Sequence, residues 1–204
     1  MITLVFDLGG VVIDWEPRRL FSKIFQPDLS RMDYFLKVVC PLEWNELQDA
    51  GRPLADAIRE RTREFPEWQE EIAIYYRRWE EMIGGRIPGT AELLSDLAAV
   101  NVPLFALSNW SRETFPLIER RFPELQLFRR IFLSADFGVA KPSPSIFEWA
   151  IHEIGAGKSD LLFIDDNRRN VIAARNVGLP SHLFVNSVEL RKALTRSGIL
   201  LSDS

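Results

Sequence analysis

Five short runs of apolar residues constrain the fold of this chain more than any other feature of its sequence. Most of them end on a polar side chain, and they fall at positions 2–7, 102–109, 130–136, 160–166 and 181–185. Continuous apolar runs, unlike alternating ones, are typical of strands that are covered on both faces, as in a parallel sheet. The sequence therefore predicts a buried sheet of parallel strands.

Helical periods separate these runs. The stretch from 88 to 100 places four apolar residues on one helical face, namely Leu93, Leu94, Leu97 and Val100. Two further amphipathic stretches are found at 143–155 and 168–178. Strands that alternate with helices imply right-handed crossovers, and so we expect an α/β fold with a Rossmann-like, doubly wound parallel sheet.

Residues 15–85 break this rhythm. The segment has no comparable strand run, is rich in helix formers and aromatic residues, and is divided by five prolines. We interpret it as a helical cap domain inserted after the first strand, with 84–89 as the hinge that leads back. The catalytic core then comprises residues 1–14 and 86–204.

The charge and composition of the chain argue against nucleic acid and membranes as binding partners. The net charge is −4, so no basic field favours nucleic acid or an anionic membrane. No apolar stretch approaches the roughly 18 residues of a spanning helix, and Asp7 interrupts the first run too early for a signal peptide. Cys40 is the single cysteine, which precludes an intramolecular disulfide. We expect a cytoplasmic protein that binds a small-molecule substrate.

Polar side chains follow the strand runs at the point where each run ends. They are Asp7, the pair Ser108 and Asn109, Lys141 before the 143–155 helix, and the pair Asp165 and Asp166. Ligands of such sheets bind beyond the carboxyl ends of the strands, where these side chains are expected to converge.

Three carboxylates in one small site raise each other's pKa unless a cation offsets them. Asp7, Asp165 and Asp166 offer the oxygen ligands that Mg²⁺ prefers, and the backbone carbonyl of Gly9 is a further candidate ligand. Asp7 is then placed to act both as a metal ligand and as the nucleophile of an aspartyl-phosphate reaction.

The remaining strand-end residues suit a phosphoryl group. Ser108 and Lys141 can hold phosphoryl oxygens, and Gly9 and Gly10 allow backbone amides to approach. Trp110 is a candidate for stacking on a sugar or an apolar substrate, next to the amide of Asn109.

Four motifs occur in the order typical of one known superfamily: "DLGGVVID" (7–14), "LSN" (107–109), "KP" (141–142) and "DDNRRN" (165–170). With them, the chain resembles the haloacid dehalogenase-like hydrolases over essentially its whole length. It is most similar to the subgroup of the bacterial α-glucose-1-phosphatase and the N-terminal phosphatase domain of soluble epoxide hydrolase. The resemblance implies a Rossmann-like core with a helical cap and Mg²⁺ as cofactor. It also implies roles for individual residues: Asp7 as nucleophile, Ser108 as phosphoryl-binding hydroxyl, Lys141 as stabilising lysine, and Asp165 and Asp166 as metal-binding acids.

Gly9 departs from the pattern of most phosphatases in this superfamily, which carry a second Asp there as general acid and base. One interpretation is a phosphatase of a sugar phosphate or similar small metabolite, whose easy leaving group needs only water or Asp14. The alternatives are a 2-haloacid dehalogenase, which needs no proton donor, and a non-catalytic binding protein. The intact acid pair favours the phosphatase; whether the chain is a monomer or a homodimer stays open.

Overall fold

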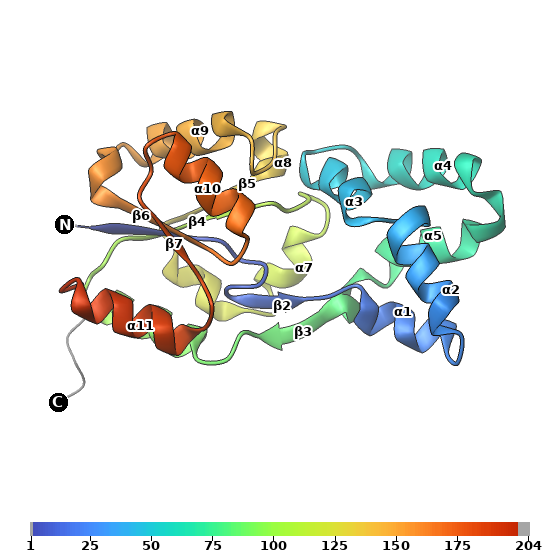
Figure 1. Ribbon diagram of the computed structural model, residues 1–204, viewed down its shortest axis with the longest axis horizontal. Coiled ribbons are helices and arrows are strands. Elements are labelled where there is room, and N and C mark those ends of the chain that lie inside the picture. The colour runs from blue at the N-terminus through green and yellow to red at the C-terminus, as the bar shows by residue number, and fades with distance from the viewer. Residues whose placement is uncertain (1, 200–204) are drawn as a thin grey trace.

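Five parallel strands form the central sheet, in the order β5-β4-β1-β6-β7 (Figure 1). The computed structural model describes residues 2–199. The strands are β1 (Thr3–Phe6), β4 (Leu104–Ser108), β5 (Arg130–Leu133), β6 (Leu161–Asp165) and β7 (Ser181–Leu183). Each neighbouring pair is parallel, which confirms the predicted Rossmann-like α/β fold.

The order of the strands fixes where a ligand can bind. From β1 the chain builds outward through β4 to β5, then returns to the other side of β1 to form β6 and β7. The direction therefore reverses between β1 and β6, and such a switch point opens a crevice at the carboxyl ends of the strands. Asp7 directly follows β1 and Asp165 ends β6, so both acids flank the crevice.

Helices cover both faces of the sheet. In Figure 1, α9 and α10 lie above the strands and α11 lies below them; α6 packs against α11. The helices of this part are α6 (Thr90–Ala99), α7 (Phe115–Glu119), α8 (Ser134–Phe137), α9 (Pro144–Ile154), α10 (Arg168–Asn176) and α11 (Ser187–Arg196). Alternate strand residues feed two separate cores: Val5 and Phe163 pack with α9, whereas Leu4 and Phe6 belong to the cluster that includes α6.

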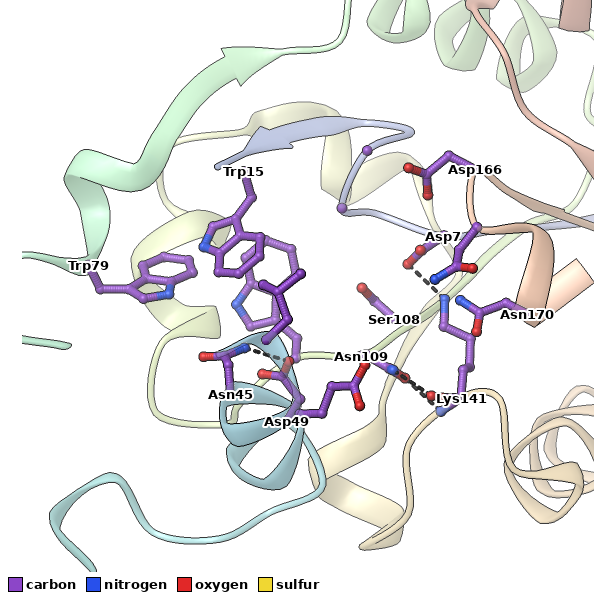
Figure 2. Close-up of a pocket in the computed structure, with 16 residues that line it drawn as sticks. Asp7, Trp15, Asn45, Asp49, Trp79, Ser108, Asn109, Lys141, Asp166 and Asn170 are labelled. Atoms are coloured by element: carbon purple, nitrogen blue, oxygen red, sulfur yellow. Dashed lines mark hydrogen bonds and ion pairs between the residues drawn. The ribbon is translucent and has the colours of Figure 1, made fainter. Parts of the chain in front are cut away.

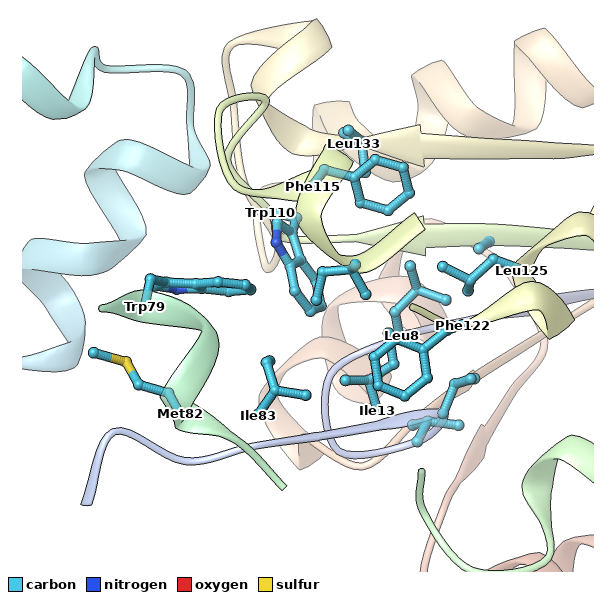
Figure 3. Packing of buried hydrophobic residues seen from close by; sticks show 14 of the residues in the cluster. Leu8, Ile13, Trp79, Met82, Ile83, Trp110, Phe115, Phe122, Leu125 and Leu133 are labelled. Carbon is cyan, nitrogen blue, oxygen red and sulfur yellow. The ribbon is translucent and has the colours of Figure 1, made fainter. Parts of the chain in front are cut away.

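The inserted segment is helical, as predicted. Its helices are α1 (Arg18–Phe25), α2 (Leu29–Tyr34) with a π-helical extension (Phe35–Val39), α3 (Leu42–Asp49), α4 (Leu54–Glu64) and α5 (Gln69–Arg77). Their aromatic side chains pack on one another; Phe21 and Phe35 have ring centroids 4.6 Å apart. The hydrophobic cluster continues into the sheet domain, where Trp79 meets Trp110 edge to face at 5.6 Å (Figure 3).

A two-stranded antiparallel ribbon, which the sequence analysis did not foresee, joins the insert to the sheet. It consists of β2 (Ile13–Trp15) and β3 (Ile83–Arg86). Part of the predicted hinge at 84–89 is therefore a strand. The ribbon lies at the two positions where we divided the chain, and the division into core and cap stays a prediction.

Two further features bear on expectations from the sequence: the lengths of the helices and the environment of Cys40. None of the helices within residues 2–199 has the length and apolar character that a membrane crossing requires. Cys40 is buried, and burial raises the pKa of its thiol above the usual value. A protonated thiol in this setting behaves as a small apolar side chain.

The predicted apolar face of α6 is correct except at its end. Leu93, Leu94 and Leu97 are fully buried, but Val100 is 43% exposed because the helix ends at Ala99. We expect Leu97→Ala to lower the free energy of unfolding by about 2–5 kcal/mol, since it leaves a cavity in the core. Val100→Ala should change it by less than about 0.5 kcal/mol. Urea denaturation of both variants checks this, and equal losses would contradict the assigned core.

Candidate functional site

A cavity of about 320 Å³ opens at the switch point of the sheet (Figure 2). Eight of the nine site residues named from the sequence line it, and the ninth, Asp165, lies behind them. Helix α3 and neighbouring parts of the insert form the other wall, with Trp15, Leu42, Asn45, Glu46, Asp49 and Trp79. The cavity thus lies between the sheet domain and the helical segment.

Asp7 is held at the end of β1 by backbone and side-chain contacts. Its amide donates to the carbonyl of Ile164 at 2.8 Å, which extends the pairing of β1 with β6 by one residue. Its Oδ1 accepts from the amide of Leu8 at 2.7 Å and pairs with Lys141 Nζ at 2.9 Å. Both contacts use Oδ1, so Oδ2 is the carboxylate atom left for chemistry.

The Lys141 side chain is almost completely buried and uses all three of its ammonium hydrogens. Its Nζ lies 2.9 Å from Asp7 Oδ1 and 2.7 Å from Asp165 Oδ2, and it donates to the carbonyl of Leu107 at 3.0 Å. An ammonium has three donors, so Lys141 is fully satisfied in this position. It therefore connects three strand ends through one atom.

The charges of Lys141 and its two carboxylate partners, Asp7 and Asp165, do not balance. Burial raises the pKa of Asp7 to about 7, partly opposed by Lys141 and reinforced by the charge of Asp165. Burial alone would lower the pKa of Lys141, but Asp165 and Asp7 together raise it above its usual value. Lys141 therefore stays an ammonium, whereas the ionised form of Asp7 calls for further positive charge.

Asp165 is fully buried, and both of its carboxylate oxygens accept hydrogen bonds from neighbouring protein groups. Its Oδ1 accepts from the amide of Asn167 at 2.7 Å, and the Asn170 side-chain amide lies 3.2 Å from Oδ1 and 3.0 Å from Oδ2. With Lys141 on Oδ2, little of this carboxylate is left for a ligand. Asn170 was missed as a site residue, although its place in "DDNRRN", five positions after Asp165 on α10, was a usable signal.

Asp166 is the exposed member of the acid pair and lines the cavity. Partial burial and the charge of Asp165 raise its pKa. Gly10 makes room for it: a Cβ at Gly10 would lie 2.2 Å from Asp166 Oδ2, and Gly10 has a left-handed φ of 75°. Gly10 lines the cavity and its amide donates to the carbonyl of Ile13 at 2.9 Å, so its expected contact with a ligand stays a prediction. Gly9 lines the cavity, and no atom lies within 4 Å of where its Cβ would be.

Asn109 and Trp110 follow Ser108 but make contacts within the protein. Both ends of the Asn109 amide bind the backbone of Lys141, at 2.8 and 2.9 Å, so this amide holds the lysine in place. Asn109 also lines the cavity, and its contact with substrate stays a prediction. Trp110 is 5% exposed and donates through Nε1 to Thr114 at 3.1 Å, leaving only part of its ring toward the cavity. Ser108 is buried at the cavity floor.

Asp14, the candidate substitute for an acid at position 9, does not line the cavity. Its carboxylate pairs with Arg19 beside Gly84, in the ribbon that joins the insert to the sheet. The acids that the insert does bring to the cavity are Glu46 and Asp49 on α3. They were missed because their position depends on how α3 packs, which no local sequence pattern reveals.

The acid cluster fits a hard divalent cation. Asp7, Asp165 and Asp166 each offer a carboxylate oxygen, and these atoms lie within 4.8 Å of one another. Three carboxylates beside one ammonium leave an excess of negative charge, and all the donors are oxygens, as Mg²⁺ prefers. Because Asp165 is saturated by hydrogen bonds, Asp7 and Asp166 are the more accessible ligands.

Comparison with known proteins gives the same family from residues 4 to 184, which match the family model described as haloacid dehalogenase-like hydrolase. A drimenol cyclase from Aspergillus calidoustus is 31% identical over 94% of this chain, and the match spans 35% of that protein's length. A sesquiterpene phosphatase from Aspergillus oryzae is 26% identical over 86% of this chain and 85% of its own length.

A similar fold occurs in a solved structure of a haloacid dehalogenase family enzyme from Bacteroides thetaiotaomicron, in complex with magnesium and inorganic phosphate. The TM-score is 0.71 at 22% identity, covering 91% of this chain and 95% of that one. At this level of identity the likeness establishes the fold alone.

Removal of the buried ammonium tests the account of Lys141. We expect Lys141→Met to lower the free energy of unfolding by about 3–5 kcal/mol, because Asp7 and Asp165 are left buried without a counter-charge. Lys192→Met, at an exposed lysine paired with Glu189, should cost less than about 1 kcal/mol. Urea denaturation in the presence of a chelator measures both; losses of similar size would show that the buried network contributes no special stability.

Proposed function

The chain belongs to the haloacid dehalogenase-like hydrolase family, and from that premise we propose that it is a Mg²⁺-dependent phosphatase of a small phosphorylated metabolite. The observation that carries the proposal is the contact of Lys141 with Asp7, which lines the cavity together with Asp166, and with Asp165 behind them. It combines a carboxylate placed for attack with the acids that hold a divalent cation.

In the proposed reaction, Oδ2 of Asp7 attacks phosphorus as the bond from phosphorus to the leaving alcohol breaks, which forms an aspartyl-phosphate. Water then attacks the phosphorus of that intermediate as the bond to Asp7 breaks, which releases phosphate. The contacts of Oδ1 with Leu8 and Lys141 fix the carboxylate, so Oδ2 is presented in one orientation. A fixed nucleophile removes much of the entropic cost of reaching the transition state.

Ser108 and Lys141 support the phosphoryl group in this proposal. The Ser108 hydroxyl lines the cavity floor and can donate to a phosphoryl oxygen. The positive charge of Lys141 lies beside Asp7 in a buried setting, where it stabilises the negative charge that develops on the transferring group. Asn109 assists by holding the backbone of Lys141 in place.

Asp7 and Asp166 are the residues we propose to bind Mg²⁺ directly, Asp7 through Oδ1, so that Oδ2 stays free to attack. The Gly9 carbonyl is a further candidate ligand, and Asp165 would orient Lys141 beside them. When bound, the cation supplies positive charge that offsets the acids and the phosphoryl oxygens. A raised pKa of Asp7 in the protein alone agrees with a site built to hold a cation.

The dehalogenase alternative fits the cavity less well. Asp7, Asp165 and Asp166 lie together and call for a cation. Such a cation can offset the charge of a phosphoryl group, but the departure of a halide does not need it. A non-catalytic binding protein would have no use for a nucleophile held with one oxygen free.

The chemical class of the substrate's organic part is inferred from the cavity wall that the insert forms opposite Asp7 and Asp166. Trp15, Trp79 and Leu42 offer ring and apolar surface, and Asn45 offers an amide. We infer a small, uncharged organic group, such as a sugar ring or an apolar chain. The cytoplasmic location and the oligomeric state stay predictions.

A phosphate-release assay tests the proposed function. Purified protein is given sugar phosphates, acyl phosphates, nucleotides, 2-haloacids and, because one relative is a sesquiterpene phosphatase, a sesquiterpenyl phosphate. We expect phosphate release that requires Mg²⁺ and falls to background in Asp7→Asn, because the nucleophile is lost. Halide release without metal would instead establish the dehalogenase.

Metal binding can be tested separately from activity. We expect Gly10→Ala to weaken Mg²⁺ binding by about 10- to 100-fold in calorimetry, as displacement of a metal-site carboxylate does, because its Cβ would overlap Asp166. Gly138→Ala is the matched control: Gly138 also has a left-handed φ, of 83°, but no atom lies within 4 Å of its Cβ position. If both variants bind Mg²⁺ as the unmodified protein does, Asp166 is not a ligand.

A further inference from the structure

Glycine at position 9 leaves the site without an obvious proton donor for the leaving group. Five of the described residues that line the cavity carry an acidic or basic side chain: Asp7, Glu46, Asp49, Lys141 and Asp166. In the proposed function, Asp7 is the nucleophile, Asp166 binds metal, and Lys141 is locked between two carboxylates. Glu46 and Asp49 remain, one turn apart on α3.

Asp49 is the better placed of the two, because its backbone is tied to the loop that follows Ser108 at the end of β4. The hydroxyl of Ser134 donates to the Asp49 carbonyl and accepts from the amide of Trp110 at 3.0 Å. Gly51 continues this contact, since a Cβ there would lie 3.2 Å from the carbonyl oxygen of Ala135. The end of α3 is thus fixed to the sheet domain beside the loop that follows β4.

The side chain of Asp49 is also held. Its Oδ2 accepts from the Asn45 side-chain amide at 2.9 Å, and Figure 2 shows this contact at the cavity wall opposite Asp7. Glu46, by contrast, is exposed to solvent.

Asp49 has the protonation behaviour that a proton donor needs. Burial and the charge of Glu46 raise the pKa of Asp49 to about 7, against hydrogen bonds from the Ser111 backbone and from Asn45 that favour the charged form. A group with a pKa near the working pH can both give up and regain a proton during turnover.

We propose that Asp49, supplied by the inserted segment, is the general acid and base of the phosphatase reaction proposed above, in place of a side chain at position 9. As the Asp7–phosphorus bond forms and the bond from phosphorus to the leaving oxygen breaks, Asp49 transfers its proton to that oxygen and the alcohol departs. Asp49 is then a carboxylate. It takes a proton from water as the water oxygen bonds to phosphorus and the Asp7–phosphorus bond breaks, which releases phosphate and restores both acids.

Steric crowding does not explain the missing acid at position 9. No atom lies within 4 Å of a Cβ built on Gly9, and its φ is outside the left-handed region. A side-chain Cβ therefore meets no obstacle at this position, which makes Gly9→Asp a direct means of replacing the function assigned to Asp49.

Dependence on the leaving group tests the proposal. Phosphate release is measured from an alkyl phosphate, which needs a proton on its leaving oxygen, and from p-nitrophenyl phosphate, which does not. We expect Asp49→Asn to lower kcat for the alkyl ester by about 10²- to 10⁴-fold while changing kcat for the aryl ester little. Addition of Gly9→Asp to Asp49→Asn should recover much of the loss on the alkyl ester.

The control is Glu46→Gln, one turn earlier on the same helix. The charge of Glu46 helps to raise the pKa of Asp49, so the ratio of the two rates should change far less in this variant than in Asp49→Asn. Equal losses on both esters in Asp49→Asn, or a selective loss in Glu46→Gln as large as that in Asp49→Asn, would overturn the assignment. A wild-type protein that releases no Mg²⁺- and Asp7-dependent phosphate from either ester would instead overturn the proposed function.

A measurement on the unmodified protein covers the case in which Asp49→Asn fails to fold. Across phosphate esters whose leaving alcohols differ in pKa, kcat/KM should vary little when an acid protonates the leaving oxygen. A steep rise in kcat/KM as the pKa of the leaving alcohol falls would mean that no acid acts, and the proposal would fail.

Discussion

The ammonium of Lys141 is the interaction on which the rest of the site depends. One nitrogen contacts Asp7 after β1, Asp165 at the end of β6 and the carbonyl of Leu107 in β4, so it joins the three central strands at their carboxyl ends. A buried charge of this kind is stable only when its partners are complete. The same requirement fixes the geometry of the nucleophile, because the Asp7 oxygen that Lys141 holds determines which oxygen is left to react.

The two halves of the site have different physical origins. The sheet supplies groups that bind and attack phosphorus, placed by the parallel order of strands around the switch point. The inserted helices supply the wall that faces the organic group, and Ser134 ties the end of α3 to the loop after β4. A site divided in this way can keep its phosphoryl chemistry while the insert changes substrate and, in our proposal, the source of the proton.

Much of the sheet side could be predicted from the sequence, and the reasons are physical. Continuous apolar runs specify buried parallel strands, and the carboxyl ends of such strands must meet, so Asp7, Ser108 and Asp166 were placed together without a structure. The insert side could not be predicted in the same way. Asp49 reaches the cavity through a contact with Ser134, 85 positions away, and the Gly10 amide is used by a local turn. Neither contact leaves a periodic pattern in the sequence.

The central claim is that Asp7 becomes covalently phosphorylated. A rapid acid quench within the first turnover, followed by peptide mass spectrometry, tests it directly on whichever substrate the protein hydrolyses best. We predict one phosphoryl group on the peptide that contains Asp7, and none in Asp7→Asn. Phosphate release without any phosphorylated peptide, with activity retained in Asp7→Asn, would contradict the account.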